Sequence, residues 1–76
     1  MPHVIVKLYS GKSDRQKQAL AQAVTQAVVS ALNYGEESVS VGIEDVEPKN
    51  WTEQVYKPDI IAKAETIYKK PGYDPR

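Results

Sequence analysis

One long amphipathic segment, residues 13–32, lies between two short runs of alternating residues, 2–9 and 38–46, and this order constrains the fold most. A helix between two strands forms a β-α-β unit, whose strands are parallel and whose crossover is right-handed in nearly all cases. The sequence therefore predicts an α/β fold (α+β by some schemes), with the helix covering one face of a parallel sheet.

Both strand-like runs have one face suited to burial, because their apolar residues recur with the two-residue period of a strand. The apolar positions are Val4, Val6, Leu8, Val39, Val41 and Ile43. The opposite face of the second run carries Ser40, Gly42 and Glu44, and is more polar.

The helix has a clear start signal, since Ser13 and Gln16 have the spacing of a capping box. Its apolar residues repeat at steps of three and four, as expected for one buried stripe. They are Leu20, Val24, Ala27, Val28, Ala31 and Leu32. We expect the helix to end at residues 33–35, with Gly35 in the left-handed conformation that helix ends favour.

The residues after Val46 predict two further helical pieces. The tetrad at 50–53 resembles a helix cap and predicts one short turn. Pro58 suits the first turn of a last helix, which we expect to run to Tyr68 and to stop at Pro71. With no linker or internal repeat, residues 1–76 are predicted to form a single domain.

The composition argues against several classes of site and partner. The chain has no cysteine and one histidine, which excludes disulfides, a thiolate metal site and a histidine-built metal centre. Ten basic and ten acidic residues argue against a nucleic-acid partner. There is no apolar run of membrane-spanning length and no signal-peptide layout, so we expect a cytoplasmic protein without a membrane partner.

The short chain also predicts self-association. A chain of 76 residues buries a small fraction of its surface, and a sheet of two strands is marginal in water. The open sheet edge would invite pairing. We therefore expect an obligate homodimer.

Pro2, directly after Met1, is the candidate catalytic residue. If Met1 is removed, Pro2 carries a secondary amine. An α-amino group titrates at about 7.7 to 8.0 in water, and burial lowers the pKa of an amine. Such a nitrogen would be a neutral base near pH 7. The alternative is an ordinary proline at the first residue of a strand.

The combination of Pro2, a strand, Gly11-Lys12-Ser13-Asp14, the Val39-Ser40-Val41 strand, Trp51 and the tail 69–73 resembles the 4-oxalocrotonate tautomerase family. It is most similar to the small dimeric bacterial members, over most of the chain. The resemblance implies a tautomerase/MIF-like fold completed by dimerisation. It also implies a cofactor-independent keto-enol tautomerase, in which Pro2 takes a proton from an enol or from a carbon beside a carbonyl and returns it further along the conjugated system.

The resemblance also implies roles for three other residues. The family's arginine at the start of the helix, which binds a substrate carboxylate, falls on Lys12. Its second-strand arginine, which polarises a keto group, falls on Ser40, and serine brings a hydrogen bond without charge. Its aromatic pocket wall matches Trp51. These departures favour an arylenolpyruvate or 2-hydroxy-dienoate type of monoacid over a dicarboxylate.

Each of these residues also has a structural interpretation. Lys12 is more commonly a solvated lysine at a helix start, and Ser40 a polar residue of the sheet face. Trp51 is more commonly a core or interface residue, and it can pack there and line a pocket together. His3 is expected to be a surface or interface histidine, and Arg15 is a second candidate for the missing arginine. The alternative function is a non-catalytic, homodimeric binding module with the same fold. Shorter relatives form hexamers, and a helix at 58–68 would cover the surface they use, so we favour a dimer.

Overall fold

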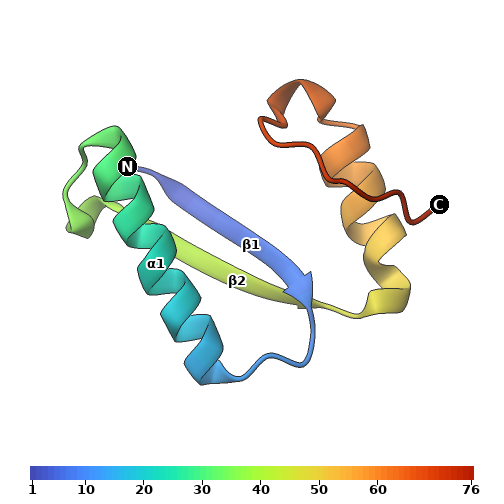
Figure 1. Ribbon diagram of the computed structural model, residues 1–76, viewed down its shortest axis with the longest axis horizontal. Helices are drawn as coiled ribbons and strands as arrows, with labels where there is room; N and C mark the ends of the chain where they lie inside the picture. Colours follow the sequence, from blue (N-terminus) through green and yellow to red (C-terminus); the bar gives the residue numbers. More distant parts are fainter. The chain divides into compact units, whose positions relative to one another are not determined.

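The structure, a computed structural model, describes residues 1–76. The chain divides into two compact units, Met1–Asp45 and Val46–Arg76. The first unit contains the strand β1 (His3–Tyr9), the helix α1 (Asp14–Leu32) and the strand β2 (Ser40–Val46), whose last residue opens the second unit. The two strands lie side by side in one parallel sheet, and α1 connects them (Figure 1). The predicted β-α-β unit is confirmed.

The helix α1 lies against the sheet face that carries the predicted apolar residues. Val41 and Ile43 of β2 line a shared hollow with residues of α1, among them Ala21. Lys17 of α1 pairs with Asp45 at the end of β2, with 2.8 Å between Nζ and Oδ2. On the opposite face, Ile5 remains half-exposed in the single chain. The sheet therefore has one covered face and one open face.

The start of α1 is built as the sequence predicts. The Ser13 hydroxyl accepts a hydrogen bond from the Gln16 backbone N–H at 3.1 Å. In return, the Ser13 backbone N–H donates to Gln16 Oε1 at 3.0 Å. Together these bonds satisfy two N–H groups that have no partner inside the helix. This capping box fixes where the loop after β1 becomes helix.

The end of α1 differs from the prediction. Asn33 takes the left-handed conformation, with φ 61°, whereas Gly35 has an ordinary φ of −75°, so the assignment to Gly35 was wrong. Asparagine tolerates this region better than most residues, and the Asn33 N–H closes the helix on the Val29 carbonyl at 3.0 Å. A 3-10 turn, η1 (Glu36–Ser38), follows, so β2 begins at Ser40 and not at the predicted Ser38.

The second unit contains a 3-10 turn η2 (Pro48–Asn50), a helix η3 (Thr52–Ile61) and a 3-10 turn η4 (Ala64–Thr66). The predicted last helix from Pro58 to Tyr68 was wrong, because Pro58 lies inside η3. This helix is wound with the wide π spacing, as in the bond from Ala62 N–H to the Lys57 carbonyl at 2.9 Å. Proline lacks an N–H and crowds the preceding turn of an α-helix, and the wide winding departs from that register.

The single chain has a very small core. Only Val46, Val55 and Tyr56 are buried. Tyr68 is fully exposed, and Leu32 and Ile61 are also exposed. None of the helices combines the length and the apolar character that crossing a membrane requires. So much open apolar surface on a short chain is typical of a protein that is completed by association.

Candidate active site

Pro2 and Ser40 meet at the amino-terminal ends of the two strands. The Ser40 backbone N–H donates a hydrogen bond to the Pro2 carbonyl at 3.1 Å. In a parallel ladder, this bond sets residue 3 beside residue 40. Pro2 is half-buried, and it is held from its carbonyl side. The proline nitrogen has no hydrogen to give to the ladder.

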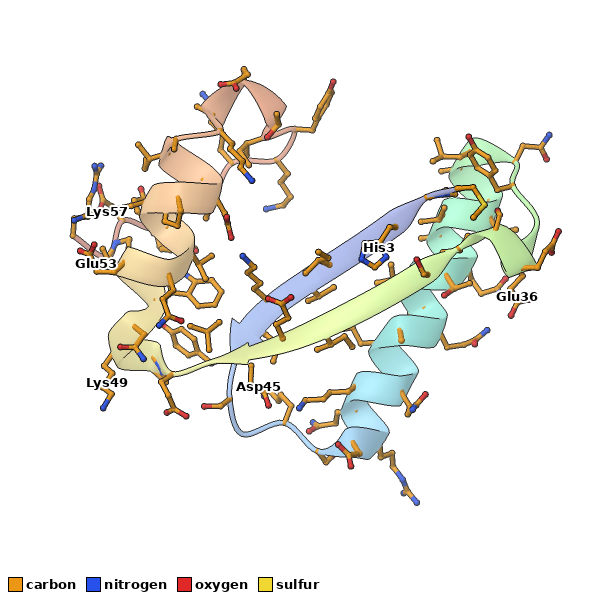
Figure 2. The ribbon with its side chains drawn as sticks, turned by 180° about the vertical axis from the view of Figure 1, so that it is seen from behind. His3, Glu36, Asp45, Lys49, Glu53 and Lys57 are labelled. Atoms are coloured by element: carbon orange, nitrogen blue, oxygen red, sulfur yellow. The ribbon has the colours of Figure 1, made fainter.

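His3 and Ser40 form a side-chain pair on the open face of the sheet. The distance from His3 Nδ1 to Ser40 Oγ is 2.6 Å, and both residues are exposed in the single chain. Figure 2 shows the His3 side chain lying over the strands. The sequence analysis expected a surface or interface histidine, and its exposure fits this. The pairing with Ser40 was missed, because the sequence does not state the register of the two strands.

Lys12 lies beyond the other end of β1, in the loop before α1. It lines a hollow of about 230 Å³ with Leu8, Gln16, Lys17 and Leu20. Lys17 is neutralised by Asp45, whereas Lys12 forms no ion pair. The hollow therefore offers one uncompensated cation to an anionic group.

Pro2 and Lys12 are too far apart to share a site within one chain. The strand β1 between them has seven residues. At about 3.3 Å per residue, such a strand separates its ends by roughly 20 Å. The structure thus brings Pro2 and Ser40 together and keeps Lys12 apart from them. A site containing both Pro2 and Lys12 needs a second copy of the chain.

Trp51 belongs to the second unit, between η2 and η3, and is half-buried. Its indole Nε1–H donates a hydrogen bond to the Tyr73 hydroxyl at 3.0 Å. The Tyr73 ring in turn packs at a tilt against Tyr56, with 5.8 Å between the ring centroids. The carboxyl-terminal tail therefore fixes the orientation of the indole, and the sequence analysis did not identify this partner.

The tail has its own ion pair next to these rings. Arg76 Nη2 lies 3.0 Å from Asp74 Oδ2, and Arg76 Nε donates to Asp74 Oδ1 at 3.1 Å. The hydrogen bonds from Arg76 lower the pKa of the Asp74 carboxyl, and the same pairing raises the pKa of Arg76. The Arg76 guanidinium also lies 5.3 Å from the centre of the Tyr56 ring.

Metal-ligating side chains are dispersed. No group of three or more histidine, aspartate or glutamate side chains could hold a metal ion. The groups available for chemistry at the Pro2 end of the sheet are the Pro2 nitrogen, the Ser40 hydroxyl and the His3 imidazole. These groups can move a proton and donate hydrogen bonds to an oxygen.

Comparison with known proteins decides the family. Residues 2–56 match the family described as "Tautomerase enzyme". The chain belongs to this tautomerase family. The match crosses the boundary between the two units and includes Pro2, Lys12, Ser40 and Trp51.

Relatives of this tautomerase-family chain cover almost its full length. A "Probable tautomerase" of Xylella fastidiosa is 42% identical over 73 residues, 96% of this chain and 89% of the relative. "Tautomerase PptA" of Cronobacter sakazakii is 41% identical over 75 residues, 97% and 99% of the two chains. A structure of the 4-oxalocrotonate tautomerase isozymes from Methylibium petroleiphilum has a TM-score of 0.64 at 38% identity, covering 66% of this chain and 81% of that one.

These comparisons confirm the resemblance to the 4-oxalocrotonate tautomerase family and its fold. They support an isomerase of the tautomerase type. The same comparisons support a small-molecule substrate and an oligomeric assembly.

Proposed function

We propose that this protein is a cofactor-independent keto-enol tautomerase in which Pro2, freed of Met1, is the general acid and base. The observation that carries the proposal is the anchoring of Pro2 by its carbonyl, which leaves the nitrogen outside the strand ladder. Removal of Met1 converts that nitrogen from an amide into a secondary amine. In a pocket that excludes water, such an amine is neutral near pH 7 and can act as a base.

The reaction is a proton transfer along a conjugated acid. The neutral Pro2 nitrogen removes the proton of an enol hydroxyl, or of a carbon beside a carbonyl, and negative charge develops on the substrate oxygen. The protonated nitrogen then returns the proton to a carbon further along the system. The Ser40 backbone N–H donates a hydrogen bond to the Pro2 carbonyl, which holds Ser40 beside Pro2. The Ser40 hydroxyl can then donate a hydrogen bond to the oxygen on which the charge develops.

The proposed substrate is a monoacid with an aromatic or alkyl tail, of the arylenolpyruvate or 2-hydroxy-dienoate type. Lys12 supplies one uncompensated cation for one carboxylate. Ser40 is uncharged, so it offers no cation to a second carboxylate. The half-buried indole of Trp51 supplies an apolar wall.

The proposed active form is a homodimer of single domains spanning residues 1–76, located in the cytoplasm. Two observations support association: only three residues are buried in the single chain, and Pro2 and Lys12 lie at opposite ends of β1. Closing a second chain over the open sheet face would cover Ile5, which is half-exposed there in the single chain. A dimer is proposed over a hexamer, because the segment 58–68 is still folded, as the end of η3 and the turn η4, and could cover the surface that shorter relatives use.

The test begins with intact mass spectrometry, which must show that Met1 is absent. The ultraviolet decay of phenylenolpyruvate is then followed for wild type, Pro2→Ala and the control Pro48→Ala. Pro2→Ala leaves a primary amine, a poorer base, and is expected to be slower by at least about tenfold. Pro48 lies at the start of η2 and is exposed, so Pro48→Ala should match wild type.

The second candidate is a non-catalytic homodimeric binding module with the tautomerase fold. The uncharged Ser40 favours it, since an enolate there lacks a full positive charge to stabilise it. Equal rates for wild type without Met1 and for Pro2→Ala would support the binding module and contradict the enzyme.

A further inference from the structure

We infer that His3 is a positioning residue, which holds the Ser40 hydroxyl so that its proton points to the substrate oxygen beside Pro2. This inference rests on the proposed function. It assigns a role to the histidine that neither the sequence pattern nor the proton transfer at Pro2 requires.

The geometry places three groups at one end of the sheet. The Ser40 backbone is fixed by its hydrogen bond to the Pro2 carbonyl at 3.1 Å. That bond leaves the Ser40 side chain free to rotate about its Cα–Cβ bond. The His3 imidazole removes this freedom, because its Nδ1 lies 2.6 Å from Ser40 Oγ on the same face of the sheet. The hydroxyl is thereby fixed at the end of the sheet where the Ser40 backbone contacts Pro2.

The direction of this hydrogen bond decides what Ser40 can do. A hydroxyl has one proton to donate and two positions to accept. If Nδ1–H of His3 donates to Ser40 Oγ, the serine proton remains available for a substrate oxygen. If the serine donates to Nδ1 instead, its only proton is used. The first arrangement is the one that supports catalysis, and accepting a bond also strengthens the hydroxyl as a donor.

The proton balance of this step is simple. Pro2 takes the proton from the substrate and later returns it to a substrate carbon. Ser40 and His3 keep their own protons throughout. His3 donates a hydrogen bond to Ser40 Oγ, and Ser40 donates one to the substrate oxygen that carries the charge in between. A donor fixed before the reaction avoids reorganisation when the charge develops.

The kinetic test uses variants that differ in where they place a donor. His3→Ala is expected to lower kcat about a hundredfold, at the weak end of the effect of losing one such donor, with KM unchanged within about twofold. His3→Asn should restore most of the rate, because the asparagine amide nitrogen lies near the position of Nδ1. His3→Gln should not, since its amide reaches the position of Nε2.

Ser40 provides the coupling test. Ser40→Ala should lower kcat as much as His3→Ala, and the double variant should be no slower than either single one. Losses that multiply in the double variant would mean that His3 acts independently of Ser40, and would overturn the inference.

A spectroscopic test is independent of turnover, because His3 is the only histidine. The ¹⁵N spectrum of the imidazole is recorded for the Met1-free protein with phenylpyruvate bound, for wild type and for Ser40→Ala. We expect a protonated Nδ1 in wild type and a changed Nδ1 resonance in Ser40→Ala. An unprotonated Nδ1 in wild type overturns the inference.

The two proposals fail in different ways. A wild-type rate for His3→Ala, beside a slow Pro2→Ala, overturns the role of His3 alone. A wild-type rate for Pro2→Ala overturns the proposed function, and the role of His3 falls with it.

Discussion

Single residues at the strand ends carry the proposed chemistry, and the sequence identified them unequally well. Pro2 stood out because its chemistry depends on its position in the chain. Lys12, Ser40 and Trp51 were identified only through the family resemblance. The pairing of His3 with Ser40 needed the structure, because alternation along a strand assigns faces but does not align one strand with another.

Lys12 is predicted to bind the substrate carboxylate. Lys12→Gln should raise KM for phenylenolpyruvate about tenfold and leave kcat within about twofold, since the charge acts on bound substrate and transition state alike. Steady-state kinetics measures this. The matched control is Arg15→Gln, which removes a neighbouring cation. A raised KM for Arg15→Gln with a normal Lys12→Gln would transfer the role to Arg15.

Asn33 is predicted to be the residue that closes α1. Asn33→Ala places a Cβ-bearing residue without a local hydrogen-bonding side chain at φ 61°, and should cost about 1 kcal/mol of unfolding free energy. Gly35→Ala should cost less, because Gly35 has an ordinary φ and the added methyl meets only the flexible carboxylate of Glu37. Urea denaturation compares the two, and the reverse order would contradict the structure.

At the scale of elements, a feature set by neighbouring residues was predicted correctly. Features for which a residue has two common structural roles, or two residues could fill one role, were not. The capping box of Ser13 and Gln16 involves only neighbours in the chain, and it formed as predicted. Pro58 was misread because proline commonly opens a helix, while here it sits within the wide helix η3. The left-handed residue at the end of α1 was assigned to Gly35, two residues late, because glycine is the commoner residue there, and asparagine also adopts that conformation.

The tail is predicted to orient Trp51 through Tyr73. Tyr73→Phe keeps the ring that packs on Tyr56 but removes the acceptor for the indole N–H, and should cost about 1 kcal/mol. Trp51 is the only tryptophan, so its fluorescence maximum reports the change. Tyr68→Phe is the control, since Tyr68 is fully exposed. An identical spectrum for both variants would argue against the hydrogen bond.

The Asp74–Arg76 pair gives the tail a dependence on pH. Because the folded pKa of Asp74 lies below its ordinary 3.8, ionised Asp74 favours the folded tail above that pH. This contribution is lost as the pH falls through the lower folded value. NMR titration of the Asp74 carboxyl should show the lowered pKa. Arg76→Gln should return it towards 3.8, and Arg15→Gln should not change it.

At the scale of the whole molecule, the near absence of a core could be anticipated from length and composition. The surfaces through which a second chain would complete the core could not be predicted, since the sequence does not say which surfaces meet. Three buried residues are too few to stabilise a chain of this size, in which much of the apolar surface stays open. The separation of Pro2 from Lys12 points to the same conclusion by a different route.

A mixing experiment tests whether two chains share one site. Pro2→Ala and Lys12→Gln are each expected to be slow at low substrate concentration. Unfolded together in equal amounts and refolded, half of the dimers should be hybrids, and each hybrid should contain one intact site. The mixture should then reach about a quarter of the wild-type rate. A rate equal to the mean of the two variants would mean that each chain holds a complete site.

The anchoring of Pro2 through its carbonyl has a practical consequence. An affinity tag joined to the amino end would leave the sheet and the helix intact, because the hydrogen bond from Ser40 does not involve the proline nitrogen. Yet the tag would acylate that nitrogen, so a well-folded preparation would be inert for a purely chemical reason. Recombinant material intended for assays should therefore carry any tag beyond Arg76.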